Sequence, residues 1–193
     1  MANNTNQKAV KHPVASIEMS SGARIMIELF PESAPNTCNS FIHLARRGLF
    51  NNREIRRVVP GFVIQPSYSS FEEPEMDYNI SGEFAAAGFE GGIPNDYGCV
   101  AMGGDGKTAS GSCFYFNLCN DKRLDGRFPV FGKVVEGLEE LKRIEGVALQ
   151  PVQSDMPGVI INVPVRPEIM KKVTIETFGH EYPPPVKLSK EKE

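Results

Sequence analysis

Alternating apolar and polar residues predict short β-strands along most of the chain. Residues 14–19 alternate weakly, Gly22 lies in a turn signal, and residues 24–30 resume the alternation, so the opening favours a β-hairpin. Residues 49–134 are β-prone runs separated by glycine-rich turns. Residues 171–178 alternate again and predict a last strand.

Helical spacing predicts two helices. The first begins near Asn36 or Thr37, either of which can cap it, and ends at Gly48; the second covers residues 135–144. Apolar residues at helical spacing are Phe41, Leu44 and Ala45 in the first helix, and Leu138, Leu141 and Ile144 in the second. Many short antiparallel strands with two helices at separated points favour a closed β-barrel capped at its ends.

The length of 193 residues fits one domain that needs no stapling. We expect a disordered tail at 1–13, a single domain at 14–180 and a frayed tail at 181–193. Residues 148–165 are interrupted by Pro and Gly and read as an insertion that shapes one end of a groove or a contact surface, without an assigned role.

The net charge of −3, without a basic block, argues against nucleic acid as the main partner. The N-terminus lacks the apolar stretch of a secretory signal, and no run approaches the ~20 apolar residues of a membrane span. We therefore expect a cytoplasmic protein with four reduced cysteines and no membrane partner. The three histidines lie far from the cysteines, so neither a metal nor a cofactor is predicted.

The run from Arg56 to Gln65 carries the most informative chemistry. Read as one strand, it places Arg57, Val63 and Gln65 on one face, because alternate side chains of a strand share a face. A guanidinium and an amide with aliphatic residues between them indicate an apolar groove with a polar edge. The alternative is a strand with Arg57 at its exposed end and Gln65 in the following loop.

Residues 101–108 end in Gly-Lys-Thr and nearly spell a phosphate-binding loop. Such a loop needs a helix directly after it, so that amide dipoles converge on phosphate. Strand-like residues 113–117 follow instead, and the first position holds Ala101 rather than Gly. The better interpretation is a β–β loop beside a groove, whose glycines permit close approach of a ligand backbone.

Five segments together resemble the cyclophilin family of peptidyl-prolyl isomerases, over roughly residues 14–180. Their order and spacing make the resemblance specific, and their departures mark a divergent, bacterial-like member. The segments are residues 30–37, 57–65 (Arg-Val-Val-Pro-Gly-Phe-Val-Ile-Gln), 101–103 (Ala-Met-Gly), 110–116 (Ser-Gly-Ser-Cys-Phe-Tyr-Phe) and 124–134 (Leu-Asp-Gly-Arg-Phe-Pro-Val-Phe-Gly-Lys-Val).

The resemblance implies a mainly β fold: a closed eight-stranded antiparallel β-barrel capped by two α-helices, with a peptide groove on its outside. It implies that Arg57 is the catalytic arginine and that Gln65 steadies both the arginine and the substrate. The substrate-binding positions that it implies are Phe62, Val63, Met102, Gly103, Gly104, Cys113, Tyr115, Leu124 and Phe128.

Several of these positions depart from the family's usual residues. Arg56 stands where His is usual before the catalytic arginine, and Pro66 begins a different continuation after Gln65. Tyr115 and Phe128 replace a common Phe and a common His of the pocket. Cys113 replaces a frequent Gln and is read as a small buried hydrophobe rather than a reactive thiol. Arg123 stands where a Trp often contacts the inhibitor cyclosporin.

The implied reaction is rotation about an Xaa-Pro peptide bond, which breaks no bond and needs no nucleophile, metal or cofactor. Arg57 suits it, because its donors can stabilise the twisted bond more than either planar form. The implied partners are proline-containing peptides and unfolded or partly folded proteins, bound by a monomer. The alternatives are a non-catalytic proline-peptide module using the same groove, for which Arg57 is not required, and a purely structural barrel or chaperone surface, which would show no saturable binding of proline peptides.

Overall fold

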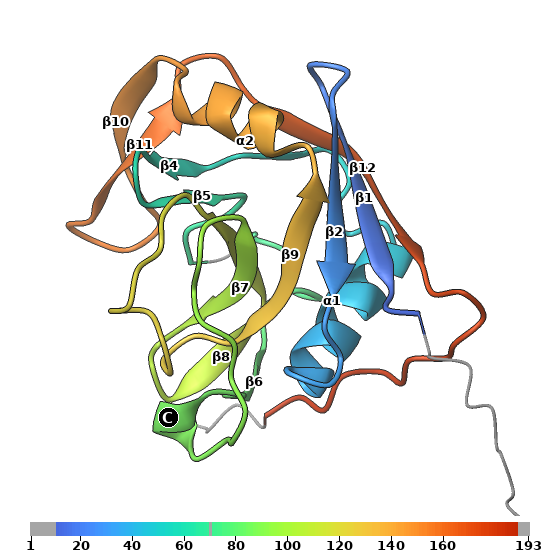
Figure 1. The fold of residues 1–193 in the computed structure, drawn as a ribbon. Helices are drawn as coiled ribbons and strands as arrows, with labels where there is room; N and C mark the ends of the chain where they lie inside the picture. The colour runs from blue at the N-terminus through green and yellow to red at the C-terminus, as the bar shows by residue number, and fades with distance from the viewer. Residues whose placement is uncertain (1–10, 70, 189–193) are drawn as a thin grey trace, which may run out of the picture.

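The computed structural model describes residues 11–69 and 71–188 (Figure 1). Its main antiparallel sheet has ten strands, hydrogen-bonded in the order β3-β12-β1-β2-β9-β7-β8-β5-β4 with β6 paired to β8, and β10 and β11 form a separate hairpin. The main-sheet strands are β1 (Val14–Met19), β2 (Arg24–Leu29), β3 (Arg53–Glu54), β4 (Arg57–Val59), β5 (Val63–Gln65), β6 (Asn79–Ser81), β7 (Cys99–Gly104), β8 (Thr108–Asn117), β9 (Val130–Glu136) and β12 (Ile169–Glu176).

The sheet curls strongly, and one run of chain joins its two edges. Ile55 and Arg56 lie between β3 and β4, the two ends of the strand order. The Ile55 amide donates to the carbonyl of Glu168 (2.7 Å), next to β12, and the Arg56 amide donates to the carbonyl of Gln65 (3.0 Å) in β5. The predicted mainly β, barrel-like fold with two helices is confirmed. More than eight strands form, because this run divides into β3 and β4 and because the short β6 pairs with β8.

The first two strands show why the alternating pattern gives this sheet. β1 pairs antiparallel with β2, and Ala15, Ile17, Ile25 and Ile27 are all at most 1% exposed. Alternate side chains of these strands therefore point into the barrel while their neighbours face outward. The predicted opening hairpin is confirmed, and the predicted last strand forms two residues earlier than expected, as β12.

The helix α1 (Pro35–Arg46) packs against β8 and β12 at one end of the barrel. The sequence predicted that Asn36 or Thr37 caps this helix, and that prediction is wrong. The cap residue is Ala34, and the backbone amides of Asn36 and Thr37 donate instead to the carboxylate of Glu83 (2.7 and 2.8 Å). Glu83, which is distant in the sequence, therefore accepts the hydrogen bonds that a local cap residue was expected to accept. The local sequence pattern does not reveal this contact.

The second helix, α2 (Leu138–Glu145), covers the opposite end, beside β2, β4 and β5 (Figure 1). It starts later than predicted, because Val135 and Glu136 still belong to β9. Gly137 makes the turn between them with φ of +94°, and a Cβ there would lie 2.4 Å from the carbonyl oxygen of Arg24. Only glycine fits both that backbone conformation and that close approach.

An aromatic cluster fills the barrel on the side of α1. Phe41 of the helix lies 5.1–5.2 Å, centroid to centroid, from the rings of Phe50, Phe114 and Phe131. Phe114 and Phe116 are at most 1% exposed, which confirms that they face the interior, opposite to Tyr115. The apolar face of the helix thus closes the core on which the outer groove is built.

Residues 148–165 form a hairpin of β10 (Leu149–Gln153) and β11 (Ile160–Pro164) that packs beside β4 (Figure 1). After β12 the chain runs back along α1: Asn36 exchanges hydrogen bonds with the backbone of Val186, and the Leu188 amide donates to the carbonyl of Asn79 (2.8 Å). The division into one domain and two tails stays a prediction, and residues 1–10 and 189–193 lie outside the described part. Within the described residues, neither α1 nor α2 is long and apolar enough to cross a membrane.

An ion-pair cluster with buried carboxylates ties α2 to the turn after β1 and to the segment before β12. Arg143 donates to Glu140 (2.8 and 2.9 Å) and to Glu168 (2.9 Å), and Ser21 also donates to Glu140 (2.6 Å). The hydrogen bonds from Arg143 hold the pKa of Glu140 below its usual value, against the opposing effect of burial. The stabilisation by this carboxylate is therefore fully present when the pH is above the usual Glu pKa of about 4.3. It is lost as the pH falls through the lowered pKa of Glu140.

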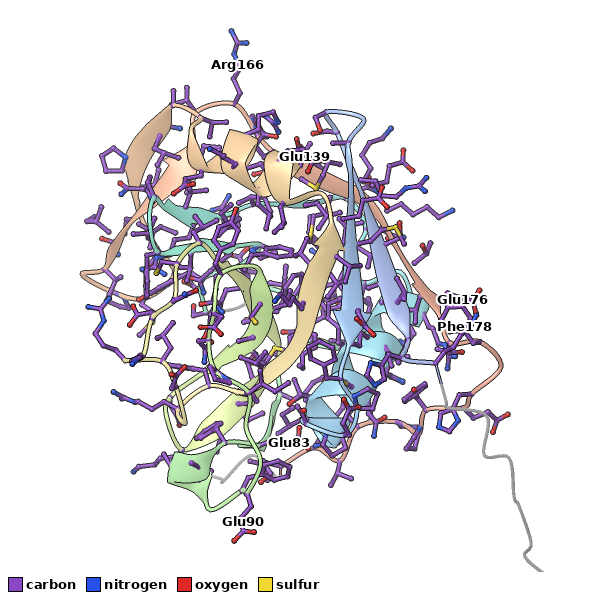
Figure 2. All side chains as sticks on the ribbon, in the orientation of Figure 1. Glu83, Glu90, Glu139, Arg166, Glu176 and Phe178 are labelled. Atoms are coloured by element: carbon purple, nitrogen blue, oxygen red, sulfur yellow. The ribbon has the colours of Figure 1, made fainter. Side chains whose placement is uncertain are left out.

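We expect Glu140→Gln to lower the free energy of unfolding by about 1–2 kcal/mol at pH 7, because charge-assisted hydrogen bonds are lost. The difference from wild type should shrink as the pH falls from 5 to 3. Urea unfolding at several pH values measures it, with Glu139→Gln, the exposed neighbour labelled in Figure 2, as the matched control. A difference that is constant from pH 7 to pH 3 would contradict the assigned role.

Candidate active site

The run from Arg57 to Gln65 is a tight hairpin, not the single strand that the alternation predicted. β4 and β5 pair antiparallel with Arg57 opposite Gln65. Between them the Phe62 amide donates to the carbonyl of Val59 (2.9 Å), and Gly61 has φ of +70°. A turn with Pro second and Gly third is the sequence signature of a type II turn. The arginine and the amide still meet, as cross-strand partners.

Arg57 is held from two sides. Its Nη1 donates to Oε1 of Gln65, and its guanidinium carbon lies 5.3 Å from the ring centroid of Tyr68. Gln65 is only 7% exposed and Arg57 is half-buried, so the alternative of a fully exposed cation and a loop amide does not hold. Burial lowers the pKa of Arg57, but an arginine remains protonated at neutral pH.

A groove of about 570 Å³ opens beside this pair, and it gathers nearly all of the predicted site residues. Met102 is the exception: its side chain is 0% exposed and belongs to the barrel core. Alternation along β7 turns it inward, away from the groove. Those that line the groove are Arg57, Phe62, Val63, Gln65, Gly103, Gly104, Cys113, Tyr115, Leu124 and Phe128.

The apolar part of the groove has its own small cluster of packed side chains. Val63 and Tyr115 are buried in it with Cys99, Ala101 and Val130, while Phe62, Leu124 and Phe128 pack against its outside. The rings of Tyr115 and Phe128 meet edge to face at 6.1 Å between centroids. The cluster lies on the outer face of β7, β8 and β9, separated from the main core by the sheet itself.

Asn95 organises this pocket from behind, and sequence reasoning missed it. Its Oδ1 accepts hydrogen bonds from the Tyr115 hydroxyl (3.0 Å) and from Nδ2 of Asn117 (3.2 Å), and its Nδ2 donates to the carbonyl of Leu124 (3.3 Å). Asn95 is 1% exposed. Burial raises the pKa of Tyr115, as do the nearby Asp121 and Asp125, so the hydroxyl stays a donor at ordinary pH.

We expect Tyr115→Phe to lower the free energy of unfolding by about 1 kcal/mol, because a buried hydrogen bond is lost while the ring remains. Tyr97→Phe is the control, since the Tyr97 side chain is 40% exposed and should tolerate the change. Urea unfolding measures both. If the two variants are equally stable, the hydrogen bond between Tyr115 and Asn95 does not stabilise the pocket.

The Gly-Lys-Thr segment lies in the short loop between β7 and β8 and at the start of β8, with no helix after it, so no phosphate loop forms. Asp105 accepts hydrogen bonds from the amides of Lys107 (2.8 Å) and Thr108 (2.7 Å), which lower the pKa of its carboxyl. A Cβ on Gly104 would lie 2.2 Å from the carbonyl oxygen of Thr108. The approach of the neighbouring strand requires this glycine, and the close approach of a ligand backbone stays a prediction.

Two of the departures from the family pattern are visible at the rim. The Arg123 guanidinium lies 5.8 Å from the ring centroid of Phe62, and its hydrogen bonds lower the pKa of Asp121 to about 2. Cys113 is 3% exposed, and its Sγ donates to the carbonyl of Ser69 (3.1 Å). In the described part of the chain, no three or more His, Cys, Asp or Glu side chains are grouped to hold a metal ion.

The fold and the site together define a class of protein: a curled antiparallel barrel with an outer apolar groove that is edged by Arg57. Residues 14–174 match the family model described as cyclophilin type peptidyl-prolyl cis-trans isomerase/CLD. The chain therefore belongs to this family, and it is a peptidyl-prolyl cis-trans isomerase. That it is a bacterial-like member stays a prediction.

Two curated relatives illustrate the match. Peptidyl-prolyl cis-trans isomerase CYP18-2 of Arabidopsis thaliana is 29% identical over 150 residues, covering 75% of this chain and 87% of that protein. Peptidyl-prolyl cis-trans isomerase ppi1 of Schizosaccharomyces pombe is 31% identical over 137 residues, covering 68% of this chain and 85% of that protein.

A solved structure shows the same fold. The cyclophilin type peptidyl-prolyl cis-trans isomerase of Cryptosporidium parvum superposes with a TM-score of 0.68 at 22% identity, covering 86% of this chain and 98% of that one. A second structure of that protein, determined in the presence of the dipeptide Ala-Pro, gives a TM-score of 0.67 over 84% of this chain and 98% of that one.

Proposed function

We propose that the groove binds an extended Xaa-Pro segment with the proline ring in the apolar pocket, and that Arg57 is the catalytic residue. The observation that carries this is the placement of Arg57. Gln65 and Tyr68 hold its guanidinium beside a pocket walled by Phe62 and Tyr115. Binding of a proline ring requires only the apolar pocket, so the fixed cation at its edge favours a catalytic role.

The chemistry asks only for a lower rotational barrier. Rotation about a peptide bond faces ~18–20 kcal/mol, because the resonance between nitrogen and carbonyl must be broken. In the twisted state the prolyl nitrogen regains its lone pair and becomes a hydrogen-bond acceptor. A donor aimed at this nitrogen stabilises the twisted state more than either planar state, and only such differential binding accelerates the reaction.

Arg57 is built for that role, and Gln65 is its positioning residue. A guanidinium carries five N–H donors in a fixed plane. Gln65 engages one of them, which fixes the plane and leaves others for the substrate. The apolar wall formed by Val63, Leu124 and Phe128 would hold the ring still while the preceding residue rotates, and it excludes water that would weaken the hydrogen bond.

We further propose that unfolded or partly folded proteins with slow Xaa-Pro bonds are the substrates. Uncatalysed exchange takes ~10–100 s, which limits the folding of many proteins. The test is refolding of a small protein whose slow phase is prolyl isomerisation, with the isomerase at a tenth of its concentration. The slow phase should become several times faster. A slow phase that stays unchanged, or slows as a non-catalytic binding module would make it, overturns the proposal. That the protein is monomeric and cytoplasmic stays a prediction.

A further inference from the structure

The β10–β11 hairpin ends in an ordered turn, residues 154–159. The Ser154 amide donates to the carbonyl of Val159 (2.9 Å), and the Ser154 hydroxyl exchanges hydrogen bonds with the backbone of Met156 (3.1 and 3.2 Å). Nε2 of Gln153 donates to the carbonyls of Met156 (2.8 Å) and Val159 (3.1 Å). These bonds fix the backbone of the turn.

The tip is anchored to the groove. The Ser69 hydroxyl donates to Oδ2 of Asp155, while the Ser69 carbonyl accepts from Sγ of Cys113 (3.1 Å). Ser69 and Cys113 both line the groove, and Tyr68, next in the chain, packs on Arg57. The hairpin thus reaches the site through the loop that supports the catalytic arginine.

Met156, beside the anchoring Asp155, lines the groove although its side chain is 47% exposed. Met76 lines it as well, and its carbonyl accepts from the hydroxyl of Ser112 (2.9 Å), which neighbours Cys113. Hydrogen bonds therefore connect Ser69 to Cys113 directly and to Met156 through its neighbour Asp155, whereas the Met76 side chain is 1% exposed and packs in the main core. Methionine side chains are flexible and polarizable, so they adapt to apolar groups of different shapes.

We infer that the tip of this hairpin forms a specificity subsite in which Met156 contacts an apolar side chain flanking the substrate proline. The inference rests on the proposed function, because the proline ring is assigned to the pocket of Phe62, Tyr115 and Phe128. A flanking side chain would then extend toward Cys113 and Ser69, which line the groove together with Met156. The preferred substrates are Xaa-Pro segments with a bulky apolar residue next to the proline.

The test compares four short peptides, with Leu or Gly placed either directly before or directly after the proline. Catalysed exchange is measured by NMR with wild type, Met156→Ser and Asp155→Ala. Ile160→Ser is the matched control, because Ile160 lies on the same hairpin, is 60% exposed and does not line the groove.

Wild type should favour Leu over Gly at one of the two positions. Met156→Ser should reduce the rate for that Leu peptide by about three- to tenfold, the scale of a partly buried apolar contact, and should leave the Gly peptide within about twofold. Asp155→Ala should act in the same direction, because it frees the tip, and Ile160→Ser should change neither peptide. Equal effects of Met156→Ser on Leu and Gly peptides, or no preference in wild type, overturn the subsite.

A failure of the proposed function would look different. Wild type would then accelerate the cis–trans exchange of none of the four peptides. The subsite would be tested instead by the binding affinities of the peptides. Tighter binding of the Leu peptide, with a shift of the Met156 methyl resonance, would support the subsite without catalysis. Equal affinities with no methyl shift would overturn it.

Discussion

Replacing Arg57 with alanine is expected to slow the catalysed exchange of an Ala-Pro peptide by about 10²- to 10³-fold, the cost of removing one well-placed donor at a transition state. The variant should still fold, because Arg57 is half-buried and contacts Gln65 and Tyr68 at the groove rather than the core. The peptide should bind almost as well as to wild type, since the apolar pocket is untouched. NMR exchange rates and peptide titrations on the same samples separate the two effects.

The chain offers a matched control one residue away. Arg56 carries the same charge, but its side chain is 55% exposed and faces Glu54 at 3.6 Å. Arg56→Ala should retain at least half of the wild-type rate, because a solvent-exposed pair contributes little. If Arg56→Ala and Arg57→Ala lose activity equally, the effect is one of net charge, and the assignment of a positioned donor is wrong.

Replacing Glu83 with alanine is expected to lower the free energy of unfolding by about 2–4 kcal/mol, the largest loss among the substitutions proposed. Its buried carboxylate accepts from the amides of Asn36 and Thr37 and from the Thr37 hydroxyl (2.7, 2.8 and 2.7 Å). Glu83 is 6% exposed, so its loss leaves two helix amides and a hydroxyl without acceptors inside the protein. It also removes a negative charge from the positive end of the α1 dipole.

Glu83→Gln keeps the shape and one oxygen acceptor, so it should fall between alanine and wild type. Glu90→Ala is the surface control: Glu90 is exposed, and Figure 2 labels both acids. Urea unfolding followed by circular dichroism measures the free energies. If Glu83→Ala costs no more than Glu90→Ala, α1 does not depend on this cap.

The sequence predicted which residues lie together in the groove better than it predicted the local structure around them. Alternation placed Arg57 and Gln65 on one strand face, whereas Pro60 and Gly61 turn the chain and make them cross-strand partners. Both arrangements bring the two side chains together, so the expected proximity followed from an incorrectly predicted element. The turn signal was present, but the flanking β-prone residues read as one strand.

Other parts of the site could not be read from local pattern, because they depend on contacts between distant segments. Asn95 meets Tyr115 across 20 residues, and Ser69 meets Asp155 across 86. Met102 was assigned to the groove with its neighbours, yet alternation along β7 sends it into the core, where it is 0% exposed. Periodicity alone would have corrected that assignment, whereas the partners of Asn95 and Asp155 required the fold.

The most direct measurement of the central claim is two-dimensional NMR exchange spectroscopy on a short Ala-Pro peptide with a few per cent of the wild-type protein. The account predicts cis–trans exchange cross-peaks on a sub-second timescale, where the free peptide shows none because its exchange takes ~10–100 s. Peptide chemical shifts that move on adding protein, with exchange as slow as in the free peptide, would contradict catalysis and leave only proline-peptide binding.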